Sequence, residues 1–286
     1  MRNRDSRARL RAILAGVECV RMGTVFDPVS ARFAEALGYR AGLVGGSIIS
    51  HAVLGAPDLI VLTLTELADQ VRRCTRVSGV PLVIDGDHGY GNALNVIRTV
   101  QELDAAGAAA VMIEDTLLPR PFGSSEMPQL LSAPESLGKI RAAIAGRANS
   151  DMLVFGRTSA VSLTGIDDAI QRLRAYAAAG VDALMLPALR TREELEAISA
   201  AVALPLVIGG PGEALRDVEL LARHRVRLFS TGHEPFSACI NALYAAMHAV
   251  IEGGALPPSA TKEVFGIAIR EAQHRAWIGD FLTPRE

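Results

Sequence analysis

The chain repeats one unit, a short apolar run followed by a stretch with helical spacing, from its N-terminal region to about residue 250. Runs of three to five apolar residues bounded by turn residues are typical of buried strands. Helical patterns lie between them, as at Ala93–Ala106, Gly165–Ala179 and Arg192–Val202. The eight predicted strands are Cys19–Gly23, Ala41–Val44, Leu82–Ile84, Ala110–Ile113, Met152–Phe155, Ala183–Leu186, Leu206–Ile208 and Val226–Phe229.

Eight strand-then-helix units predict a closed parallel barrel, because buried parallel strands need a helix to cross back between them. A doubly wound open sheet is the alternative, but eight units exceed its usual number. We therefore predict an α/β fold, a (β/α)₈ TIM-type barrel, with residues 1–286 as a single domain. The loops that follow the strands of such a barrel share one face, and this face carries the chemistry.

The two ends of the chain carry further helical patterns. Residues 1–20 are basic and then apolar, but the apolar part is short, and Leu10, Ile13 and Leu14 follow helical spacing, which predicts a surface helix rather than a signal peptide. Glycine and proline pairs end the last barrel helix near residue 253. A helix resumes over Lys262–Ile278, so we predict residues 255–286 as a C-terminal helical extension that is swapped onto a neighbouring subunit.

Composition excludes several classes of protein. The net charge is −2, with 29 basic and 31 acidic side chains, whereas nucleic-acid binders usually show a basic excess. Cys19, Cys74 and Cys239 cannot all pair within one chain, which favours a reducing compartment. The longest apolar stretch, residues 41–57, is interrupted by glycines, serines and a histidine, unlike a membrane span. We expect a cytoplasmic protein that binds neither nucleic acid nor membrane.

The strongest motif is Asp85-Gly86-Asp87-His88-Gly89-Tyr90-Gly91-Asn92, directly after the third predicted strand. Its two carboxylates can reach one hard cation, and Glu114 follows the fourth strand on the same face. Oxygen ligands of this kind suit Mg²⁺ or Mn²⁺. The alternative is that these acids cap helices or decorate turns. Three acids on adjacent strand ends, set among glycines, favour the metal site.

Three more strand ends carry candidate substrate-binding groups. Gly45-Gly46-Ser47 follows the second strand, and its N–H groups either hold a carboxylate or enolate oxygen or simply form a tight turn. Arg157 follows the fifth strand, where it binds a substrate carboxylate, pairs with the acids, or does both. His233 follows the eighth strand, a position that favours a role in the site over a merely exposed or capping histidine.

These motifs together resemble the isocitrate lyase/phosphoenolpyruvate mutase superfamily over nearly the whole chain. The resemblance rests on residues 85–92, Ile113-Glu114-Asp115, Gly45-Gly46-Ser47 and Gly156-Arg157-Thr158. It implies an α/β barrel, bound Mg²⁺, chemistry on a 2-oxo acid or its enolate, and a homotetramer, a dimer of helix-swapped dimers.

The loop after the fourth strand indicates the branch. Carbon–carbon lyases of the superfamily carry a Lys-Lys/Arg-Cys-Gly-His loop whose Cys is the acid catalyst, and phosphonomutases and phosphonopyruvate hydrolases carry a Lys-Asn-Ser type loop. Residues 117–125 here read Leu-Leu-Pro-Arg-Pro-Phe-Gly-Ser-Ser, which matches neither. Residues 92–100 and 113–119, Phe122-Gly123 and Gly232-His233 look most like the oxaloacetate decarboxylase branch.

That resemblance assigns roles and an activity. It implies Asp85 as the direct Mg²⁺ ligand and a metal-stabilised enolate in the decarboxylation of oxaloacetate to pyruvate and CO₂. The alternatives are a carbon–carbon lyase acting on another 2-hydroxy diacid, or a non-catalytic barrel that binds a dicarboxylate as a sensor. The resemblance implies that Arg157 and His233 act in catalysis. It implies substrate contacts from Ser47, Arg157 and His233, and metal-bound water held by Asp58, Asp87 and Glu114.

Overall fold

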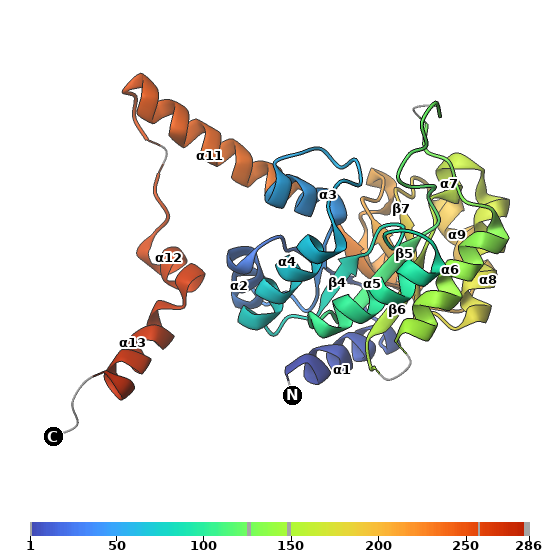
Figure 1. Cartoon of the computed structure of the whole chain (residues 1–286), viewed down its shortest axis with the longest axis horizontal. Coiled ribbons are helices and arrows are strands. Elements are labelled where there is room, and N and C mark those ends of the chain that lie inside the picture. Colours follow the sequence, from blue (N-terminus) through green and yellow to red (C-terminus); the bar gives the residue numbers. More distant parts are fainter. Residues whose placement is uncertain (1, 125–126, 148–149, 257, 283–286) are drawn as a thin grey trace.

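The structure is a computed structural model that describes residues 2–124, 127–147, 150–256 and 258–282 (Figure 1). One sheet contains all the strands, and every pairing in it is parallel. Its members are β1 (Val20–Arg21), β2 (Gly23–Thr24), β3 (Gly42–Val44), β4 (Leu82–Asp85), β5 (Ala110–Glu114), β6 (Leu153–Arg157), β7 (Ala183–Pro187), β8 (Leu206–Gly209) and β9 (Val226–Ser230).

The first strand closes the sheet into a barrel. β1 and β2 are its two halves, separated by Met22; β1 pairs with β9 and β2 with β3. The Met22 N–H donates to the carbonyl of Phe229 across 2.8 Å, so the seam stays bonded at the break. The nine segments therefore act as eight strands. The predicted (β/α)₈ barrel is confirmed, and each predicted strand lies within two residues of an observed one.

Helices follow the strands in sequence and surround the sheet. Several begin at a capping box, in which the N-cap side chain accepts a hydrogen bond from the N–H three residues on; Thr63, Asn92 and Thr191 do this. Short helices α3 (Gly46–Ile49), η1 (Ser50–Leu54), α7 (Ala160–Leu163) and η2 (Glu213–Leu215) lie within the connections. The covering helices are α2 (Pro28–Ala36), α4 (Leu64–Val77), α5 (Ala93–Ala105), α6 (Ala133–Gly146), α8 (Ile166–Ala179), α9 (Arg192–Ala201) and α10 (Val218–Arg223).

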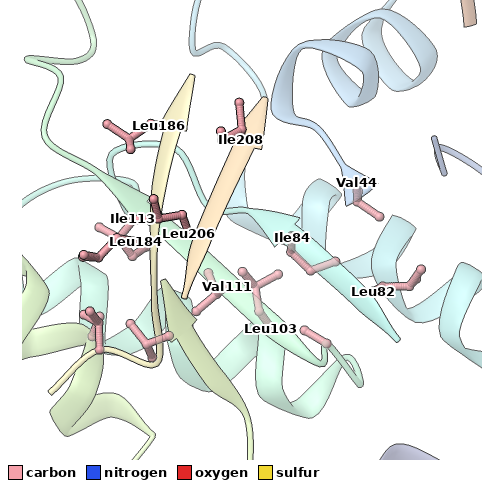
Figure 2. Packing of buried hydrophobic residues seen from close by; sticks show 14 of the residues in the cluster. Val44, Leu82, Ile84, Leu103, Val111, Ile113, Leu184, Leu186, Leu206 and Ile208 are labelled. Atoms are coloured by element: carbon pink, nitrogen blue, oxygen red, sulfur yellow. The ribbon is translucent and has the colours of Figure 1, made fainter. Parts of the chain in front are cut away.

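The hydrophobic core has two shells, because successive side chains on a strand point to opposite faces. Outward-facing residues such as Ile84, Val111 and Ile208 pack against the helices (Figure 2). The inward-facing residues fill the barrel itself and alternate with the outward ones along each strand. Among them are Val83, Met112, Leu153, Phe155, Ala183, Met185, Val207 and Leu228.

Helix α1 (Arg2–Ala15) covers the end of the barrel at which the strands begin (Figure 1). Leu10, Ile13 and Leu14 are buried and belong to the cluster that fills the barrel interior. Arg7 fixes the helix by donating to the Ala108 carbonyl at 3.0 Å and by pairing with Asp104 at 2.6 Å. The expected surface helix is therefore confirmed, and the structure adds that its apolar face closes the barrel floor.

The chain leaves the barrel after β9. Helix α11 (Glu234–Glu252) stands in the eighth barrel-helix position but projects away from the barrel, followed by α12 (Lys262–Ile269) and α13 (Glu271–Phe281) (Figure 1). In place of one helix over Lys262–Ile278, the chain breaks at Arg270, which has a left-handed φ of 51°. Here α11–α13 are called the arm. No helix in the described ranges is both long and apolar enough to cross a membrane.

Candidate functional site

A cavity of about 590 Å³ opens at the end of the barrel where the strands finish. Its charged walls continue the inward-facing series of three neighbouring strands: Asp85 follows Val83, Glu114 follows Met112, and Arg157 follows Phe155. Every residue expected in the site lines this cavity except Gly46, which lies against Asp87. The lining members of that set are Gly45, Ser47, Asp58, Asp85, Asp87, Glu114, Arg157 and His233.

Arg157 is fixed by two acids. Its Nη1 donates to both carboxylate oxygens of Asp85, at 2.8 and 2.7 Å, and its Nη2 lies 3.0 Å from Oε2 of Glu114. Glu114 on β5 and Arg157 on β6 lie opposite each other in the strand register, and this brings their side chains into contact. Burial alone would lower the pKa of Arg157, but the carboxylates together raise it, so the side chain stays cationic. The pairing with the acids is thus observed, and a contact with substrate stays a prediction.

The acids of the cavity outnumber its cations. Asp87 is 8% exposed, adopts a left-handed φ of 47°, and donates its N–H to Asp85 Oδ1 at 3.3 Å. Burial, then repulsion from Asp85 and Glu114, raises the pKa of Asp87 well above its ordinary value. Burial and the charge of Asp85 also raise the pKa of Asp58. Four carboxylates against the guanidinium groups of Arg157 and Arg120 leave an excess of acidic groups, and a bound cation would relieve their repulsion.

The acids do not form a closed metal cage. Among the residues that the structure describes, no three His, Cys, Asp or Glu side chains are placed to hold a metal ion directly. Mg²⁺ commonly keeps several water ligands and takes only one or two carboxylates from the protein, so the charge excess and the open arrangement fit that ion. Direct ligation by Asp85, with Asp58, Asp87 and Glu114 acting through water, is compatible with this geometry and stays a prediction.

Ser47 and His233 form a second pair at the mouth of the barrel. Ser47 Oγ and His233 Nε2 lie within hydrogen-bonding distance, at 2.8 Å. Burial lowers the pKa of His233, which favours the neutral ring, although the nearby Asp85 opposes the shift. A neutral imidazole and a hydroxyl can both present a proton to a substrate oxygen without bringing a further charge.

Gly46 is required for space, and the space beside Gly45 is tight. A Cβ on Gly46 would lie 2.6 Å from Asp87 Oδ1, and one on Gly45 would lie 3.3 Å from His233 Cε1. The absence of side chains therefore lets the second-strand loop meet both the acidic cluster and the histidine. Whether the N–H groups of this loop bind an anion stays a prediction.

Other residues of the cavity were not expected from the sequence. The loop between β5 and α6 borders the mouth, and its described parts are residues 116–124 and 127–131. Leu117 donates to the Gln129 carbonyl at 2.8 Å, which holds the two parts together. Thr116, Arg120 and Gln129 line the cavity from this loop, whose sequence has no periodic signal. Ser230 follows Leu228 in the inward series of β9, so strand alternation does predict its place.

Comparisons with known proteins agree with this geometry. A family model described as phosphoenolpyruvate phosphomutase matches residues 10–251. A protein of Paraburkholderia xenovorans (strain LB400), named oxaloacetate decarboxylase, is 57% identical over 97% of this chain and 94% of its own. One of the same name from Rhodopseudomonas palustris (strain BisA53) is 49% identical, over 99% and 96%.

Solved structures with the same fold include an oxaloacetate acetylhydrolase in complex with 3,3-difluorooxalacetate. It has a TM-score of 0.86 and 27% identity, and the match covers 96% of this chain and 97% of the other. A phosphonopyruvate hydrolase in complex with oxalate and Mg²⁺ has a TM-score of 0.81 and 26% identity, with coverage of 97% and 99%.

The burial of His88, next to Asp87, predicts a loss of stability in acid. Burial, then the charge of Lys139, lowers the pKa of His88 to about 4, so its ring stays neutral while the unfolded chain takes up a proton below about pH 6.5. As the pH falls, this proton uptake stabilises the unfolded state relative to the folded state. The unfolding free energy should therefore fall less between pH 7 and pH 4.5 in His88→Gln than in the unmodified protein, by about 2 kcal/mol. Urea unfolding of both proteins at pH 7 and at pH 4.5 measures this difference in unfolding free energy.

The control for this prediction is His248→Gln, a change on the arm helix α11. That variant should show the same pH dependence of unfolding as the unmodified protein. A His88→Gln protein that loses as much stability in acid as the unmodified one would contradict the prediction.

Proposed function

The chain belongs to the phosphoenolpyruvate phosphomutase family, and we propose that it decarboxylates oxaloacetate to pyruvate and CO₂ with the help of bound Mg²⁺. The observation that carries the proposal is near full-length similarity, at 49–57% identity, to proteins named oxaloacetate decarboxylase. The acidic cluster, the fixed arginine and the Ser47–His233 pair support it, because they supply the groups that a 2-oxo dicarboxylic acid requires.

The side chains of the cavity divide the work of binding. When bound, Mg²⁺ supplies a Lewis acid that withdraws electrons from the 2-oxo acid end of the substrate. Arg157 keeps Asp85 and Glu114 in place and offers the positive charge nearest to a substrate carboxylate. Ser47 and His233 hydrogen-bond the C2 oxygen, where negative charge develops, and such a donor is worth more in a half-buried site than in water.

Decarboxylation balances without a protein nucleophile. The C3–C4 bond breaks, C4 leaves as CO₂, and the bonding pair moves between C3 and C2 while the carbonyl pair moves onto the C2 oxygen. A proton added at C3 then gives pyruvate. No acid is needed for CO₂ to leave, which agrees with a loop of residues 116–125 that contains neither Cys nor His. Burial raises the pKa of the Cys19 and Cys74 thiols to about 12, and neither lines the cavity.

Three other functions are consistent with the same cavity. A carbon–carbon lyase acting on a 2-hydroxy diacid must protonate its departing enolate, and residues 116–125 contain neither a Cys nor a His for that step. A non-catalytic sensor of dicarboxylates would bind oxalate without turnover, but it has no need for the charge excess around Asp87. An oxaloacetate hydrolase would release oxalate and acetate instead of pyruvate and CO₂, so product identity separates it from the proposal.

We also propose a cytoplasmic homotetramer, a dimer of helix-swapped dimers, built from a single-domain chain with residues 255–286 as a helical extension. The arm supports the proposal because α11 projects away from its own barrel (Figure 1) and many of its apolar side chains are exposed. An exposed apolar face of this extent marks an interface in soluble proteins. Its side chains on α11 are between 49% and 83% exposed, among them Ile240, Leu243, Tyr244, Met247, Val250 and Ile251.

The proposed metal predicts that chelation abolishes turnover. EDTA should remove pyruvate formation from oxaloacetate, and Mg²⁺ or Mn²⁺ should restore it. Asp85→Ala should lower kcat/KM at least about a hundredfold, because the charge that develops on the C2 oxygen loses its main stabilisation. Asp69→Ala is the control, since Asp69 lies on the outer side of α4 in an exposed pair with Arg72. Undiminished turnover of Asp85→Ala in EDTA would rule the metal out.

The missing acid predicts the choice of reaction. With one enzyme preparation, kcat/KM should be far larger for pyruvate release from oxaloacetate than for cleavage of methylisocitrate, and no oxalate should form. His233→Ala should lower decarboxylation about 10²–10³-fold through the lost hydrogen bond to the C2 oxygen. Cys239→Ser, on exposed α11, should keep full activity. Faster cleavage of methylisocitrate than decarboxylation would show that an acid elsewhere in the chain was overlooked.

The exposed arm predicts assembly. Light scattering should give the mass of four 30.3 kDa chains at micromolar concentration. Introducing charge with Leu243→Asp and Tyr244→Asp, which are 58% and 71% exposed, should split the tetramer into smaller species. Arg98→Ala, on the outer side of α5, should leave the mass unchanged. A stable monomer for the unmodified protein would contradict the proposed assembly.

A further inference from the structure

A buried polar cluster lies behind the cavity wall without lining it. Asp115 is 2% exposed, Arg172 is 7% exposed and Tyr176 is 1% exposed. Asp115 Oδ2 accepts hydrogen bonds from Tyr176 Oη at 2.9 Å and from Arg172 Nη1 at 3.2 Å. These three residues, here called the clasp, join the end of β5 to helix α8. Breaking a buried charge pair of this kind is costly, because it leaves one charged partner buried and unpaired.

Arg172 joins the two ends of the loop that borders the cavity. Its Nη1 contacts Asp115, just before the loop, and donates to the Leu131 carbonyl, at the loop's end, across 3.0 Å. The backbone N–H of Leu131 donates to the Asp115 carbonyl at 2.8 Å. The guanidinium is itself held by Asp168, which accepts from Arg172 Nε at 2.9 Å. One side chain on the helix thus fixes both loop ends.

Tyr176 connects the same cluster to the strand of Arg157. A Cβ on Gly156 would lie 3.0 Å from the tyrosine ring, so the ring packs directly on the backbone that precedes Arg157. Asp115, which Tyr176 holds, directly follows Glu114. The clasp therefore contacts the chain beside both members of the Arg157–Glu114 ion pair as well as both ends of the loop.

We propose that Asp115, Arg172 and Tyr176 are positioning residues that fix the frame of the loop, in its described parts 116–124 and 127–131, over the cavity and thereby set substrate affinity. The loop supplies Thr116, Arg120 and Gln129 to the cavity wall, whereas the reacting end is bounded by other elements. The clasp should accordingly act on KM more than on kcat. Its effect on KM rests on the proposed function, whereas its effect on the loop does not.

The test compares two Arg→Lys changes on one helix. Arg172→Lys keeps the charge but cannot reach Asp168 and both loop ends together, while Arg174, exposed on the same helix with a bond to the Ala201 carbonyl, provides the matched control. Chymotrypsin cleavage after Phe122, which is fully exposed within the loop, reports the loop directly. Arg172→Lys should speed this cleavage about tenfold, as the loss of one charge-assisted hydrogen bond implies, and Arg174→Lys should not.

Two further measurements separate positioning from a general loss of structure. In Arg172→Lys, oxalate binding by calorimetry with Mg²⁺ should weaken about tenfold, and KM for oxaloacetate should rise with kcat changed less than about threefold. Unchanged cleavage and unchanged oxalate affinity in a folded Arg172→Lys protein would overturn the proposal. Inactivity of every variant toward oxaloacetate, with the cleavage difference intact, would instead count against the proposed function.

A milder variant keeps the test decisive if Arg172→Lys fails to fold. Tyr176→Phe removes the hydroxyl that donates to Asp115 and leaves the ring against Gly156. It should speed cleavage after Phe122 in the same direction by a smaller factor, about threefold, because Arg172 still holds the carboxylate. Cleavage of Tyr176→Phe at the unmodified rate would overturn the clasp's control of the loop.

Discussion

Side chains on a strand alternate between the barrel interior and the helix layer, and this alternation decides where the charged groups of the cavity can lie. Val83, Met112 and Phe155 fill the barrel, so the next inward positions, Asp85, Glu114 and Arg157, arrive together at its mouth. Helix α1 closes the opposite end with apolar side chains. The barrel thus has an apolar floor and a charged rim, and a ligand meets the charges from one direction.

The rim is held together by an ion pair that leaves charge uncompensated. Arg157 contacts Asp85 and Glu114, which lie on the two preceding strands of the sheet. Asp58 and Asp87 add two more carboxylates, and the raised pKa of Asp87 records the cost of placing them there. Burial makes each of these interactions stronger than it would be in water. A divalent cation bound at the rim would offset part of this excess of negative charge.

Two segments outside the barrel, the loop over the cavity and the arm, differ in how they pack. The loop over the cavity is tied to α8 through Arg172, within one chain and close to the site. The arm is different, because α11 projects away from the barrel (Figure 1) and exposes many apolar side chains. Two parts of the arm contact its own barrel: Phe236 at the start of α11 is buried, with its ring 5.0 Å from that of Phe26, and Arg270 after α12 pairs with Glu35 of α2 at 3.2 Å.

The sequence by itself determined the barrel and most of its rim. Eight apolar runs with helices between them have few ways to bury their surface, and a residue just past a buried strand, such as Asp85 or His233, must lie at the mouth. It did not determine that Leu10 closes the floor, that the chain breaks at Arg270, or that Arg120 and Gln129 reach the cavity. Helical spacing identifies an apolar face but not its partner, and a loop without periodicity carries no register. Those features depend on contacts between residues far apart in the chain, such as Arg172 with Leu131, which only the folded structure brings together.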